Sequence, residues 1–224
     1  MVKLKNKSQQ NFVNEDDVNQ WISHATKDMA HKPSTIVNDS LNETITKPKA
    51  IFIAASDFSI DPHGLTGACP GTFYVIQNAA GIIAPGQGKG ADLSIGATLE
   101  FAVKIYKVRH IIVMASPDCG LLNCLLDEEA KDVNSLVDGQ FLPSWISLAA
   151  SAISRVANGN FTNEERKRIC SQELMKISFE SLMTYPWILD GLYDGSITLH
   201  GWYYDAANGQ FSWFDPTNDD FISN

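Results

Sequence analysis

The sequence predicts an α/β fold with a mainly parallel central sheet flanked by helices. Short runs of almost only apolar residues are typical of parallel strands buried on both faces, and they occur at residues 50–55, 73–77 and 110–115. Longer stretches with helical spacing follow or separate these runs, at residues 92–107, 141–158 and 163–183. Strands that alternate with helices in this way are joined by right-handed crossovers, so residues 92–107 are predicted to be a crossover helix.

The first 49 residues are predicted to be a polar tail, one helix and a connector, ahead of an α/β domain at residues 50–224. The helix should begin near Asn14 and end before Pro33, since proline disfavours a helical residue before it. Its apolar residues form one stripe: Val18, Trp21, Ile22, Ala25 and Met29. Such a stripe must be buried against another apolar surface.

The C-terminal part is predicted to end in two strands, at residues 197–204 and 210–214. Asn208-Gly209 lies between them and is a strong signal for a tight hairpin turn. The long helix before them should end at Tyr185-Pro186. Residues 81–90 are rich in glycine and proline and are predicted to be a loop.

The composition excludes several classes of partner. The 224 residues are 44% hydrophobic, which suits one globular core, and the net charge of −9 disfavours nucleic acid and anionic membranes. No apolar run has the roughly 18 residues of a membrane span, and no secretory signal is recognisable. The four cysteines lack the spacing of a disulfide framework, so a reduced, cytoplasmic protein is expected.

Two polar stretches follow predicted strands, and each precedes a predicted helix. The first is Ala55-Ser56-Asp57-Phe58-Ser59, and the second is Ser116-Pro117-Asp118-Cys119-Gly120. In an open α/β sheet, ligands bind beyond the carboxyl ends of the strands. The two stretches are therefore predicted to line one site at this edge of the sheet.

These stretches resemble the motifs of the β-class carbonic anhydrases, a family of zinc lyases with Cys-Ser-Asp-Ser-Arg after the first strand and His-x-x-Cys-Gly after the third. On this resemblance, the first zinc cysteine falls on Ala55 and the second on Cys119. The zinc histidine falls on Ser116. The aspartate falls on Asp57, and its arginine partner falls on Ser59.

The resemblance continues from about Pro48 to about Asp215. Pro70–Ala79 is similar to the family's Pro-Gly-x-x-Phe-Val-x-Arg-Asn segment, with Gln77 at the arginine and Asn78 at the asparagine. The Ala97–Val103, Leu182–Trp187 and Leu199–Asp205 segments also match family segments. The resemblance implies the family's fold, an N-terminal helix that packs on a partner subunit, and a homodimer or a higher homo-oligomer.

The zinc chemistry of the family depends on donors that this chain replaces. A catalytic zinc takes three protein ligands, but Ala55 has no donor atom and Ser116 offers only a neutral hydroxyl. Asp57 and Cys119 are the remnant ligand positions, so no zinc cofactor is expected. Zinc lowers the pKa of its bound water from about 15.7 to about 7. This makes deprotonation of the water easier by about 11–12 kcal/mol, and no remaining side chain offers a comparable stabilisation of hydroxide.

The same residues also allow other kinds of chemistry. Asp57, Asp118 and Cys119 could form a replacement metal site, with His63 and Cys69 as further donors nearby. Cys119 could be a reactive thiol, because a helix N-terminus lowers a thiol pKa while Asp118 opposes this effect. A serine nucleophile lacks a base. The loop Gly86–Gly90 lacks the spacing of a phosphate-binding loop.

The sequence therefore predicts a zinc-less, β-carbonic-anhydrase-like pseudoenzyme without carbon dioxide hydration activity, which acts in binding, regulation or assembly with an unknown protein partner. Two alternatives remain open: a carbonic anhydrase (carbonate dehydratase, a lyase) or related small-substrate enzyme with an atypical site, and a sensor of a small anion. The same predicted pocket serves all three: Ala55, Asp57, Ser59, Gln77, Asn78, Ser116, Asp118, Cys119 and Gly120.

Overall fold

The computed structural model of the chain describes residues 47–58, 61–68, 71–88, 92–126, 139–157 and 159–223. The predicted N-terminal helix lies outside the described residues, as do Ser59 and Cys69. The division of the chain at residue 49 stays a prediction.

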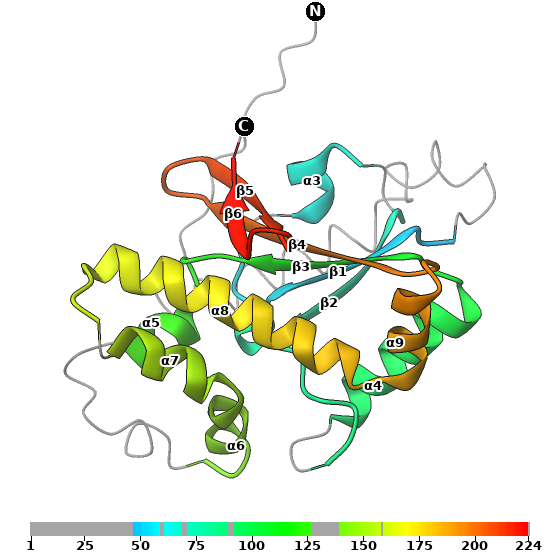
Figure 1. Ribbon diagram of the computed structural model, residues 1–224, viewed down its shortest axis with the longest axis horizontal. Coiled ribbons are helices and arrows are strands. Elements are labelled where there is room, and N and C mark those ends of the chain that lie inside the picture. The colour runs from blue at the N-terminus through cyan, green and yellow to red at the C-terminus, as the bar shows by residue number, and fades with distance from the viewer. Residues whose placement is uncertain are drawn as a thin grey trace, which may run out of the picture. The chain divides into compact units, whose positions relative to one another are not determined.

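A six-stranded sheet in the order β2-β1-β3-β4-β5-β6 forms the centre of the described part (Figure 1). The first four strands in this order pair in parallel, as the apolar runs predicted. The last two pair antiparallel, and Gly209, with a φ of 64°, lies in the predicted hairpin turn. The short strand β6 was not predicted. The strands are β1 (Ala50–Ala55), β2 (Phe73–Asn78), β3 (His110–Ala115), β4 (Thr198–Asp205), β5 (Gln210–Asp215) and β6 (Asp220–Ile222).

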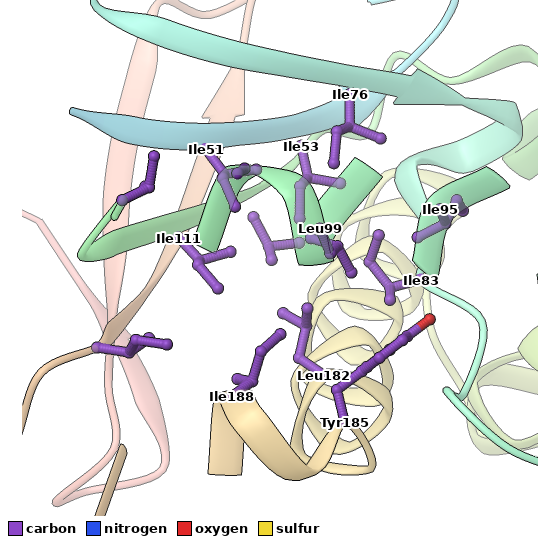
Figure 2. Close-up of a cluster of buried hydrophobic side chains, with 14 of the residues drawn as sticks. Ile51, Ile53, Ile76, Ile83, Ile95, Leu99, Ile111, Leu182, Tyr185 and Ile188 are labelled. Carbon is purple, nitrogen blue, oxygen red and sulfur yellow. The ribbon is translucent and has the colours of Figure 1, made fainter. Parts of the chain in front are cut away.

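The central strands β1 and β3 are buried on both faces, which explains their nearly continuous apolar sequences. All six residues of β1 are buried, as are five of the six in β3. Ile51 and Ile53 of β1 pack in one apolar cluster with Ile111 of β3, and Figure 2 shows helical residues such as Leu99 closing that cluster from below the sheet. The alternate residue Phe52 belongs to a second cluster.

Most helices lie on one side of the sheet, and α3 lies on the other (Figure 1). Three predicted helices are confirmed near their expected positions, but two of them are interrupted. Residues 93–105 form α4 followed by a π-helical turn, and residues 142–157 form two α-helices joined by a 3-10 turn. Helix α9 was not predicted; proline at its first helical position ends one helix and begins the next. The helical elements are α3 (Pro62–Thr66), η1 (Ala79–Gly81), α4 (Leu93–Glu100), η2 (Phe101–Ile105), α5 (Gly120–Leu126), α6 (Leu142–Ile146), η3 (Ser147–Ala149), α7 (Ala150–Ala157), α8 (Asn163–Met183) and α9 (Pro186–Tyr193).

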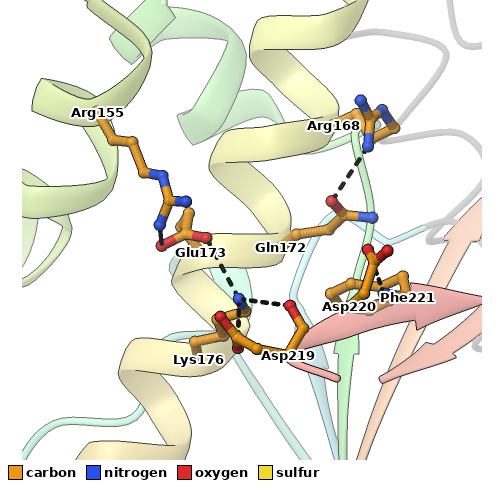
Figure 3. Close-up of polar contacts among 8 residues, drawn as sticks. All are labelled: Arg155, Arg168, Gln172, Glu173, Lys176, Asp219, Asp220 and Phe221. Carbon is orange, nitrogen blue, oxygen red and sulfur yellow. Dashed lines mark hydrogen bonds and ion pairs between the residues drawn. The ribbon is translucent and has the colours of Figure 1, made fainter. Parts of the chain in front are cut away.

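Side chains of helix α8 contact both α7 and the turn between β5 and β6. The helix begins with a capping box, in which the Thr162 side chain accepts from Glu165 N–H and the Glu165 side chain accepts from Thr162 N–H. Figure 3 shows Glu173 of α8 accepting from Arg155 of α7 at 2.8 Å, while Lys176 lies 2.7 Å from the Asp219 carboxylate beside β6. These contacts join α7, α8 and the β5–β6 turn.

Among the described residues, no helix has both the length and the apolar character needed to cross a membrane.

Candidate functional site

The two predicted stretches meet at the carboxyl edge of the sheet. Ala55 is the last residue of β1, and Ser116 directly follows β3. Both are buried, at 6% and 7% exposure, and Cys119 beside them is 4% exposed. The strands are held in fixed parallel register, so the sheet itself places these three residues together.

Ala55, Ser116 and Cys119 line the same small cavity. Its volume is about 20 Å³, which is room for roughly one water molecule. The rest of its lining is mostly apolar and comes from η1, β3, α5 and α8. Ala55, Ser116 and Cys119, which stand at the family's zinc-ligand positions, therefore lie around one cavity. Few polar atoms line that cavity.

Asp57 makes a different contact from the one the resemblance implies. Its Oδ2 accepts a hydrogen bond from the backbone N–H of Gly120 at 2.5 Å, and the residue is exposed. Gly120 permits this approach, since a Cβ at that position would lie 2.7 Å from Asp57 Oδ2. The carboxylate thus holds the loop after β1 against the first residue of α5.

Cys119 is a neutral thiol in this setting. Burial raises its pKa, and the Asp57 carboxylate adds to that rise, while hydrogen bonds from Leu122 and Leu121 act in the other direction. The sequence prediction weighed a helix N-terminus against Asp118, but burial is the largest effect and the opposing charge is that of Asp57. A thiol with a raised pKa is a poor nucleophile at neutral pH.

The other predicted pocket residues are at the same edge but make mainly structural contacts. Ser116 Oγ accepts from Asp118 N–H at 3.1 Å. Asn78 donates through Nδ2 to the Ile82 carbonyl at 2.8 Å, and its buried Oδ1 has no hydrogen-bond partner in the described part. Gln77 is exposed at the end of β2. Of these residues Ser116 lines the small cavity, whereas Gln77, Asn78 and Asp118 do not, so the predicted pocket is only partly brought together.

His63 does not complete a metal site here. It lies on α3, within 3.5 Å of Asp61, and its ring packs on Phe73 at a centroid distance of 5.3 Å. Among the described residues, no three His, Cys, Asp or Glu side chains gather in a way that would hold a metal ion. The donors at the carboxyl edge, one thiol and one carboxylate bonded to Gly120, are too few for the three protein ligands of a catalytic zinc.

The sequence reasoning missed two contributors to this edge. Gly81 has a φ of 65°, and a Cβ there would lie 3.0 Å from the Ala54 carbonyl carbon and from Ala55 N. Tyr203 of β4 is 5% exposed, and burial, aided by Asp205, raises its pKa to about 12. The glycine lies in a loop recognised from composition, but its contact with β1 is a tertiary feature that the sequence does not signal.

Comparisons with known proteins agree with this fold. The family model described as carbonic anhydrase matches residues 50–211. The chain is 30% identical over 165 residues to the mitochondrial β-carbonic anhydrase 6 of Arabidopsis thaliana, which covers 72% of this chain and 54% of that protein. It is also 30% identical over 177 residues to a carbonic anhydrase of Pseudomonas aeruginosa, covering 79% and 77%. The match thus spans about half of the plant relative.

Solved structures give the same result. The β-carbonic anhydrase CcaA superposes with a TM-score of 0.77 and 26% identity, covering 93% of this chain and 92% of that one. A tetrameric β-carbonic anhydrase of Sordaria macrospora gives 0.67 at 20% identity, covering 89% and 97%, which shows the fold alone. With the family model matching most of the chain, the protein belongs to the β-carbonic anhydrase family.

Proposed function

We propose that this protein is a β-carbonic anhydrase family member that holds no catalytic zinc, does not hydrate carbon dioxide, and acts through binding, regulation or assembly. One observation carries the proposal. Of the three residues that stand at the zinc-ligand positions, only Cys119 has a soft donor, since Ala55 has no donor atom and Ser116 offers a neutral hydroxyl.

The size and charge of the carboxyl-edge cavity favour a non-catalytic role over the sensing of an anion at that site. A volume of about 20 Å³ admits roughly one water, which is less than a small oxyanion needs. Asp57 and Asp118 lie at the same edge and repel an anion. We therefore place the binding function on the outer surfaces of the molecule.

Homo-oligomerisation forms part of the proposal. The relative from Sordaria macrospora is tetrameric, and the helix predicted from the sequence around residues 18–29 would carry an apolar stripe that an apolar surface has to cover. We expect a dimer or a larger assembly, measured as the molar mass by light scattering of the eluted protein.

The experiment that tests the loss of zinc is metal analysis of the purified full chain after incubation with zinc under reducing conditions. We expect far less than one zinc per chain. The double variant A55C/S116H restores a thiolate and an imidazole beside Cys119, which completes three ligands. It should bind close to one zinc per chain, whereas A55C alone and S116H alone should not.

A stopped-flow assay of carbon dioxide hydration separates the proposal from its main alternative. The wild-type rate should equal the buffer rate, with and without added zinc. Close to one zinc per wild-type chain, or a rate clearly above buffer, would support the atypical enzyme and contradict the proposal. Circular dichroism of each variant checks that the substitutions leave the fold intact.

A further inference from the structure

A second hollow lies at the opposite, amino edge of the sheet. It has a volume of about 380 Å³ and is formed by the ends of η2 and α9 and by the segments that lead into β3 and β4. Val103, Val108 and Ile197 give it an apolar floor, and Trp187 forms part of its wall. Its charged lining residues are Lys104, Lys107, Arg109, Asp190 and Asp194.

Three of these five charges have partners. Lys104 Nζ donates to Glu100 at 2.6 Å and lies 5.7 Å from the centroid of the Trp187 ring. Asp194 accepts from Ser196 N–H at 2.8 Å, and hydrogen bonds from Ser196 and the nearby charge of Arg109 lower its pKa. Arg109 also donates through Nε to the Ser196 carbonyl at 3.4 Å.

Lys107 and Asp190 are different. Within the described residues, neither side chain has a hydrogen-bond or ion-pair partner, and the two do not pair with each other although they line the same hollow. The lining of the hollow therefore includes one exposed ammonium group and one exposed carboxylate that are unpaired within the described residues, together with an apolar floor.

The backbone at Lys107 gives a second reason to assign a role to its side chain. Its φ is 60°, in the left-handed region, where the chain turns from η2 into β3 and the Val108 N–H donates to the Ala102 carbonyl at 3.1 Å. Glycine is the usual residue at such a helix end, because a side chain is strained there. A strained residue beside a π-helical turn is a common feature of functional sites.

We propose that this hollow binds a small zwitterion of the amino acid type. The carboxylate of the ligand would pair with Lys107, its ammonium group would pair with Asp190, and its flat apolar side chain would lie against Trp187. The site is remote from the carboxyl edge, so this proposal stands apart from the proposed loss of zinc.

The test uses three probes on the full chain, measured by calorimetry at low ionic strength. L-phenylalanine carries both charges, 3-phenylpropionate lacks the ammonium group and phenethylamine lacks the carboxylate. Phenylalanine should bind with a dissociation constant of about 1 mM or lower, and each single-charge probe should bind at least about tenfold more weakly.

Two variants then separate the two charges. K107G should weaken phenylalanine at least about tenfold without weakening phenethylamine, and D190N should weaken phenylalanine without weakening 3-phenylpropionate. Since glycine suits the backbone of Lys107, K107G should remain folded, which thermal melting checks. K167A, which removes a lysine from the far end of α8, is the charge-matched control and should bind as the wild type does.

The proposal fails if wild-type protein does not bind phenylalanine, or if K107G and D190N both bind it as the wild type does. It also fails if 3-phenylpropionate binds as tightly as phenylalanine, since that result would describe a simple anion site.

Discussion

The two edges of the parallel part of the sheet differ in how tightly they are packed and in how many charged side chains they carry. At the carboxyl edge, Ala55, Ser116 and Cys119 are buried around a cavity of about 20 Å³. At the amino edge, charged side chains surround an open hollow of about 380 Å³, and the imidazole nitrogens of His110 and His200 lie 3.1 Å apart nearby. The edge at which the family's chemistry resides is closed and poor in donors, whereas the other edge is open and rich in charge.

The sheet fixes where the strand-end residues lie, but it does not fix their chemical character. Both edges use the same strands, and the same parallel register sets where each strand begins and ends. What differs is the residue at each strand end. Tight packing at the carboxyl edge and charged side chains at the amino edge contribute differently to stability. Single substitutions at each edge can measure these contributions as changes in the free energy of unfolding.

The largest expected effect tests the close packing of the carboxyl edge. In G81A, the new Cβ lies 3.0 Å from backbone atoms of Ala54 and Ala55, and the φ of 65° is strained for alanine. We expect a loss of about 2–4 kcal/mol in the free energy of unfolding, from left-handed strain plus overpacking. Urea denaturation followed by circular dichroism measures it.

G88A is the matched control for that variant. Gly88 also has a positive φ, of 87°, but no atom lies within 4 Å of its built Cβ. It should lose only about 1 kcal/mol, from the backbone strain alone. If G81A and G88A lose the same stability, the carboxyl edge is not tightly packed against η1 and the contrast between the two edges weakens.

A smaller effect tests the polar contact at the carboxyl edge. D57A removes the acceptor for Gly120 N–H and should cost about 1 kcal/mol, the usual value for losing a side-chain contact at a helix start. D118A removes a neighbouring carboxylate that makes no side-chain hydrogen bond in the described part, so its unfolding free energy should be nearly unchanged. Equal losses in the two variants would show that the Asp57 contact adds nothing.

The smallest effect concerns the amino edge and depends on pH. Burial lowers the pKa of His200, and the charge of His110 lowers it further. The unfolded chain, with a histidine pKa of about 6.5, therefore takes up this proton first as the solution is acidified. The stability contributed by neutral His200 is present above about pH 6.5 and is lost as the pH falls through the pKa of the folded state.

H200Q should therefore lose less stability than the wild type between neutral and mildly acidic pH, as measured by urea denaturation at each pH. H110Q should give an intermediate loss, because burial of His200 remains while the neighbouring charge is gone. An unchanged pH dependence in both variants would contradict the account of this histidine pair.

Much of the fold could be predicted from the sequence, because the two central strands β1 and β3 are apolar over nearly their whole length. The apolar runs predicted β1, β2 and β3 closely, and Asn208-Gly209 predicted the β4–β5 hairpin. The helix breaks at η2 and η3 were missed, because helical spacing continues through both breaks while the hydrogen bonding changes. Helix α9 was missed because a proline signals the end of one helix and the start of the next equally well, and Pro186 is the first residue of α9.

At the candidate site, the sequence predicted the positions but not the contacts. Two strand-end motifs were enough to bring Ala55, Ser116 and Cys119 together, since parallel strands share an edge. The Asp57–Gly120 hydrogen bond and the approach of Gly81 to β1 depend on loop conformations that no local pattern encodes. The direction of the Cys119 pKa likewise depends on burial by α5 and α8, which is a tertiary property.

The fully buried pairing of β1 with β3 has an evolutionary consequence. Because hydrogen bonds and apolar packing hold these strands together, the geometry of the edge does not rely on an ion to maintain it. A lineage that substitutes the residues at the strand ends keeps a stable scaffold, on which surface sites elsewhere are free to diversify. The same independence makes the chain a suitable host for rebuilding a metal centre one residue at a time.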